Sequence, residues 1–102
     1  MNPLVLKKSQ QTLQNYFELD KLSEDDGYQK LLEYLTEEVA YLIEHDFERL
    51  LFILYRIDVS EQKVKKATAE SGLDEAPGKI AELIIERQVQ KVKTRKEFSQ
   101  NS

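Results

Sequence analysis

Residues 28–59 read YQKLLEYLTEEVAYLIEHDFERLLFILYRIDV and form the densest run of apolar side chains in this 102-residue chain. In the first part of the stretch, apolar residues recur at steps of three and four, which places them on one side of an α-helix. These residues are Tyr28, Leu31, Leu32, Leu35, Val39, Leu42 and Ile43. We therefore predict an amphipathic helix here, against which the other segments pack.

A second apolar set follows with the same spacing: Phe47, Leu50, Leu51, Leu54 and Ile57. A continuous helix would turn Asp46 into the apolar stripe, so we expect a break at His45-Asp46. Asp46 suits the N-cap of the second helix, because its carboxylate accepts a free backbone N–H and is favoured by the helix dipole. The alternative is one unbroken helix of roughly 30 residues, about 45 Å long.

Residues 50–55 are apolar without interruption, so the second helix is apolar nearly all round. Such a helix is either central in its own bundle, the more common arrangement, or half buried with a partner on its other side. Phe52 distinguishes the two, because it projects opposite the Phe47 and Leu50 side. If the chain leaves Phe52 uncovered, a homodimer contact is the simplest explanation. The residues predicted to form that contact are Arg49, Phe52, Tyr55 and Arg56.

The segments before residue 28 predict one helix and one turn. Residues 3–22 suit a weakly packed helix with Pro3 in its first turn. Residues 23–27, SEDDG, read as a turn.

After Ile57, either Asp58 or Ser60 is suited to cap a short surface helix that continues to about Glu70. Ser71-Gly72 ends it, since glycine adopts the left-handed conformation freely. Residues 73–78 predict a connection, and residues 79–98 an amphipathic helix. Its apolar side comprises Ile80, Ala81, Leu83, Ile84, Ile85, Val89 and Val92.

The whole pattern predicts an all-α bundle of four principal helices plus a short extra helix, with mostly antiparallel neighbours. At 40% hydrophobic residues, the chain fits one domain over residues 1–102, with residues 1–4 and 99–102 disordered. The absence of cysteine excludes disulfides and thiolate catalysis. No signal peptide or membrane span is recognisable, so we expect a cytoplasmic protein without membrane contact.

Charge is distributed unevenly along the chain, whose net charge is −4. Residues 1–17 carry +2, residues 18–48 carry −9 and residues 49–102 carry +3. The acidic and basic parts can satisfy each other within one fold or between two antiparallel copies. On residues 28–48, the acidic side consists of Glu33, Glu37, Glu44 and Glu48, which suits either solvent or a basic partner.

The basic C-terminal residues are candidate phosphate contacts: Arg87, Lys91, Lys93, Arg95 and Lys96. They also favour the negative end of a helix dipole, which explains them without a ligand. Nucleic-acid binding is therefore the alternative function, and the acidic isoelectric point of about 5.1 weighs against it.

One stripe, Tyr34, Glu38, Tyr41 and His45, combines a carboxylate and an imidazole that could bind a metal or move a proton. Paired di-metal bundles need two such histidines, however, and this chain has one. No phosphate-binding glycine loop or catalytic triad pattern occurs. We therefore predict a protein that is not an enzyme and has no catalytic, cofactor or metal site.

Four short motifs resemble a group of short α-helical bacterial proteins of unknown function. They are EHDFER at 44–49, YRIDVSE at 55–61, IER at 85–87 and KTR at 93–95. The resemblance covers about the last two thirds of the chain. It implies a helical domain in a bacterial cytoplasm and supplies no activity. Together with the residues above, it favours a small protein-interaction module that acts as a homodimer.

Overall fold

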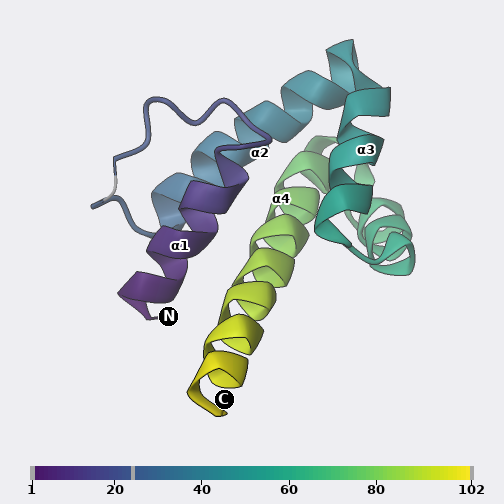
Figure 1. The fold of residues 1–102 in the computed structure, drawn as a ribbon. Coiled ribbons are helices and arrows are strands. Elements are labelled where there is room, and N and C mark those ends of the chain that lie inside the picture. Colours follow the sequence, from purple (N-terminus) through teal and green to yellow (C-terminus); the bar gives the residue numbers. More distant parts are fainter. Residues whose placement is uncertain (1, 24, 102) are drawn as a thin grey trace.

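The computed structural model describes residues 2–23 and 25–101, with side chains as far as Arg95. Its helices are α1 (Pro3–Leu13), α2 (Tyr28–His45), α3 (Phe47–Ile57) and α4 (Glu61–Asn101), arranged as in Figure 1. No strand occurs within the residues described, so the all-α prediction is confirmed. The helices pack as a bundle measuring 42 × 30 × 21 Å.

The C-terminal half of α4 contributes seven of the 21 buried apolar residues among those described. Helix α4 packs against α1, α2 and α3, and its predicted apolar side is buried at Ile80, Ala81, Ile84, Ile85, Val89 and Val92. Both α1 and α2 run opposite to this half of α4 (Figure 1), as expected for antiparallel neighbours. The core is therefore shared between residues 28–59, which contribute nine of these buried residues, and α4, which packs against each of the other three helices.

The predicted break at Asp46 is confirmed, and the unbroken helix is wrong. Helix α2 ends at His45, and Asp46 adopts φ −156° and ψ 69°, outside the helical region. The Asp46 carboxylate accepts a hydrogen bond from the backbone N–H of Arg49 at 3.2 Å. This N-cap starts α3 in a new direction.

The N-terminal helix is shorter and better packed than predicted. It ends at Leu13 instead of residue 22, and Val5, Ser9 and Leu13 are buried at steps of four. The chain then continues without helix, yet Phe17 and Leu22 are buried in the core. The segment after α1 therefore contributes apolar side chains to the core although it is not helical.

Helix reaches into both segments for which disorder was predicted, and that disorder stays a prediction. Pro3 and Leu4 form the first turn of α1, where the Asn2 side chain accepts a hydrogen bond from the Leu4 N–H at 2.8 Å. At the other end, α4 extends to Asn101. Met1 and Ser102 lie outside the described residues.

The predicted connection over residues 73–78 is wrong, because helix resumes directly after Gly72. Gly72 has φ 75° and ψ 174°, so α4 consists of two helical halves that meet at a kink. The positive φ at Gly72 was predicted. Pro77 therefore lies in the second turn after the kink rather than deep within 41 unbroken helical residues.

Candidate functional site

One side of α3 exposes four large apolar residues to solvent. The exposed fractions are 52% for Phe47, 49% for Leu51, 58% for Phe52 and 82% for Tyr55. At 3.6 residues per turn, these positions adjoin one another on a single side of the helix. We call these four residues the α3 face.

The opposite side of α3 is buried and differs from the side predicted. Leu50, Ile53, Leu54 and Ile57 are buried, with the spacing i, i+3, i+4, i+7. Phe47 and Leu51 were expected in the core and are half exposed instead. The cap at Asp46 restarts the helix, so the side of α3 that meets α2 and α4 is not a continuation of the α2 stripe. Helix α3 is therefore half buried rather than central.

Of the four predicted contact residues, Phe52 and Tyr55 lie on the α3 face itself. Arg56 is exposed one turn after Phe52. Arg49 is also exposed and lines a groove with Tyr41 and His45. The sequence reasoning missed Phe47 and Leu51, although the four-residue spacing of 47, 51 and 55 is itself a helical stripe.

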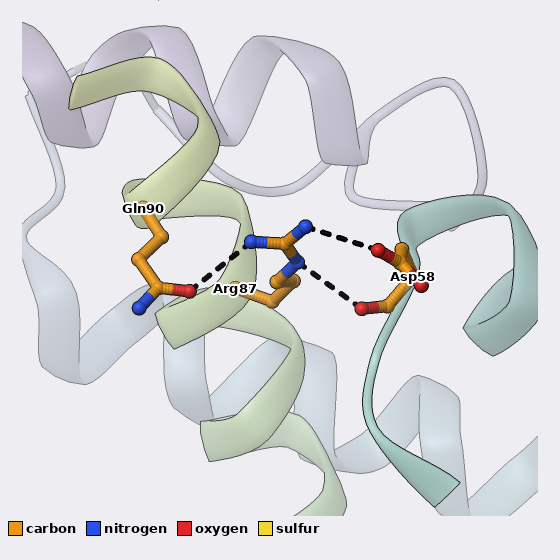
Figure 2. Close-up of polar contacts among 3 residues, drawn as sticks. All are labelled: Asp58, Arg87 and Gln90. Atoms are coloured by element: carbon orange, nitrogen blue, oxygen red, sulfur yellow. Dashed lines mark hydrogen bonds and ion pairs between the residues drawn. The ribbon is translucent and has the colours of Figure 1, made fainter. Parts of the chain in front are cut away.

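Arg87, a predicted phosphate contact, anchors the end of α3 to α4 (Figure 2). Its Nη2 lies 3.0 Å from Oδ2 of Asp58, and its Nε donates to the Asp58 carbonyl oxygen at 3.1 Å. Its Nη1 donates to the side-chain oxygen of Gln90 at 3.2 Å. Asp58 terminates α3 in the left-handed conformation, with φ 67°. Arg87 is thus engaged by a structural contact.

Lys91 and Arg95 follow Arg87 at steps of four and share one side of α4. The pKa of Lys91 is lowered, first by burial and then by Arg87, with smaller contributions from Arg95 and Arg56. Asp58 opposes the shift. Cations of α3 and α4 therefore gather near the C-terminal end of α3.

Lys93 is separated from that group. It lines a shallow groove of about 610 Å³ together with Tyr28, Glu82 and Glu86. The pKa of Tyr28 is raised there, by burial first and then by the two glutamates. The side chain of Lys96 lies outside the described part. The five predicted phosphate contacts therefore do not form one surface.

Three residues of the stripe proposed for metal or proton chemistry, Glu38, Tyr41 and His45, line a groove of about 660 Å³ between α2 and the segment after α1, and Tyr34 does not. The rings of Tyr41 and His45 are 4.5 Å apart. Glu38 accepts a hydrogen bond from the backbone N–H of Glu18 at 2.8 Å, which holds that segment against α2. Among the described residues, no three acidic, histidine or cysteine side chains gather as metal ligands.

The predicted acidic side is solvated, and the break at Asp46 places Glu48 on α3 while Glu33, Glu37 and Glu44 remain on α2. Glu33 pairs with Lys30 at 3.7 Å and Glu44 lies 3.8 Å from His45, with all four side chains more than half exposed. Such exposed pairs contribute little to stability. Glu37 and Glu48 have no ion pair within the part of the chain that the structure describes.

No protein-family model, curated protein or solved structure matches this chain. The resemblance to short bacterial helical proteins therefore stays a prediction. Across residues 2–23 and 25–101, no helix is long and apolar enough to cross a membrane.

Proposed function

We propose that this chain is a cytoplasmic, non-enzymatic protein-interaction module that acts as a homodimer through the α3 face. The observation that carries the proposal is the 58% exposure of Phe52, because three further apolar residues are exposed beside it on an 11-residue helix. Isolated apolar residues are normal on protein surfaces, whereas adjoining ones indicate a contact site.

The size of the face suits the centre of a dimer interface. A buried aromatic side chain covers about 200 Å², so the exposed parts of Phe47, Phe52 and Tyr55 present roughly 400 Å² per copy. A standard interface buries about 800 Å² per partner, with an apolar centre and a polar rim. The α3 face thus supplies about half of the area required, and Leu51 and the neighbouring polar residues extend it.

The composition of the surface also suits an interface. Aromatic residues and arginine are enriched at protein contacts, whereas lysine and aspartate are depleted. The α3 face contains three aromatic rings, and the exposed Arg49 and Arg56 belong to the same helix. A charged rim of this kind selects the partner, while the aromatic centre supplies most of the affinity.

Nucleic-acid binding, the alternative, draws less support from this geometry. Arg87 is occupied by Asp58, and Lys93 lines a groove with two glutamates. The chain also carries a net charge of −4. A titration with single- and double-stranded DNA and RNA tests the alternative. Binding that weakens steeply between low and moderate salt would favour it over the dimer proposal.

The proposal is tested by light scattering across a range of protein concentration. We expect the wild type to reach twice the monomer mass and Phe52→Glu to remain a monomer with unchanged helicity. Leu73→Glu is the matched control, since Leu73 is an apolar residue outside α3 with 94% exposure. A wild-type chain that stays monomeric at all concentrations, or a dimer unaffected by Phe52→Glu, contradicts the proposal.

A further inference from the structure

Glu48, Phe52 and Arg56 form a single stripe on the exposed side of α3. They are four residues apart, so each lies one turn beyond the last. Phe52 is therefore flanked by an acid on one side and a base on the other. Neither Glu48 nor Arg56 has an ion-pair partner among the described residues.

The charges around the two ends of α3 reinforce this polarity. Asp46, the N-cap, directly precedes the helix at its acidic end, and Glu44 lies in the last turn of α2 beside it. At the basic end, Lys91 of α4 lies within electrostatic reach of both Arg56 and Arg95, which lower its pKa after burial and Arg87, while Asp58 opposes them. Arg49 lies at the acidic end and Asp58 at the basic end, but in net charge the first end of α3 is acidic and the other basic.

We propose that the partner on the α3 face is a second copy in antiparallel orientation, with Phe52 on the two-fold axis and Glu48 facing Arg56 of the other copy. The inference rests on the homodimer proposed above and adds its orientation and the residues that set it. Charge complementarity identifies a second copy as the partner, because the acidic end of the stripe meets the basic end of an identical stripe only when the two helices are antiparallel.

The geometry of the helix supports this arrangement. Glu48 and Arg56 are eight residues apart, about 12 Å along the axis, and Phe52 is midway between them. A two-fold axis at Phe52 brings the two rings together and makes two identical Glu48 to Arg56 contacts. Parallel packing places glutamate on glutamate and arginine on arginine. Antiparallel packing also opposes the two helix dipoles favourably.

The test measures the dimer dissociation constant by analytical ultracentrifugation for Glu48→Lys, Arg56→Glu and the double variant carrying both. Each single variant replaces two attractive contacts with two repulsive ones, so we expect roughly tenfold weaker dimers. In the double variant the charges are exchanged, and we expect the affinity to return to within about threefold of wild type. Glu37→Lys makes the same charge change on the exposed side of α2 and should leave the constant unchanged.

The outcomes separate this inference from the proposed function. Wild-type protein that is monomeric overturns both. A dimer that Phe52→Glu dissolves, but that the single reversals leave intact or the double variant fails to restore, overturns only the antiparallel arrangement. Circular dichroism of every variant at the same temperature shows whether a weaker dimer reflects a lost contact or a lost fold.

Discussion

Replacing Gly72 with alanine should destabilise the protein through the backbone alone. Gly72 has φ 75° and ψ 174°, a region that only glycine adopts without strain, and an added Cβ meets no atom within 4 Å. The cost is therefore conformational and not steric crowding by neighbours. Placing a residue with a side chain in that region costs about 1–3 kcal/mol.

Gly78→Ala is the matched control with the opposite sign. Gly78 lies inside the helix after the kink, and its added Cβ would have ordinary contact with Cγ2 of Thr36 at 3.9 Å. Alanine in a helix interior is favoured over glycine by about 0.5–1 kcal/mol. Both variants change the unfolded chain in the same way, so that effect cancels when they are compared.

Denaturant titration followed by circular dichroism measures both free energies of unfolding. We expect Gly72→Ala to be less stable than wild type and Gly78→Ala more stable, with a separation of about 1.5–4 kcal/mol. The kink is held in place because only three residues link the end of α3 to Glu61, so a straight α4 would pull α3 from the core. If Gly72→Ala matches or exceeds the stability of wild type, the kink at Gly72 is refuted.

Three further changes test the packing. Gln88 is 2% exposed and its Nε2 has no hydrogen-bond partner in the described chain. Gln88→Met should therefore raise the free energy of unfolding by about 1 kcal/mol. A lower melting temperature for this variant in thermal unfolding would show that the amide is paired. Arg87→Met removes both contacts to Asp58 and should cost about 1 kcal/mol and speed amide exchange at the end of α3; unchanged exchange contradicts the anchor. The pKa of Tyr28 is raised by burial and by two glutamates, so the neutral phenol is favoured in the folded state. The contribution of Tyr28 to the free energy of unfolding is fully present below the ordinary tyrosine pKa, and it is lost as pH rises through the raised pKa of the folded state. In a titration followed by phenolate absorbance, Tyr28→Phe should remove the part of the curve at the highest pH. An unaltered curve refutes the raised pKa of Tyr28.

Local features of the fold were predictable where the chemistry of a single residue determines the backbone conformation. Asp46 has the carboxylate that caps a helix, and Gly72 is the residue that adopts a positive φ without strain, so both breaks were identified from the sequence. The extent of the N-terminal helix was not predictable in this way. Phe17 and Leu22 are buried in the core from a segment without helix, and that burial depends on contacts with distant residues.

The candidate site was partly predictable for a related reason. The position of Phe52 opposite the buried side of α3 was predictable from the helical repeat. Its exposure was not, because the sequence left open whether another segment covers that side. Phe47 and Leu51 lie at the border, where a small rotation moves a residue between core and surface. Their exposure is set by the packing of α3 on α2 and α4, which the helical repeat alone does not specify.

Two polar contacts orient α3 while leaving its exposed side uncovered. At its start, the Asp46 carboxylate accepts the Arg49 N–H, and at its end Arg87 binds both the carbonyl and the carboxylate of Asp58. A helix fixed at both ends loses little further freedom when a partner binds, which favours association. Under the proposed homodimer, Arg87→Met should therefore weaken dimerisation even though Arg87 lies off the α3 face. An Arg87→Met dimer as tight as wild type would show that the burial of Leu50, Ile53 and Leu54 orients the helix without the anchor.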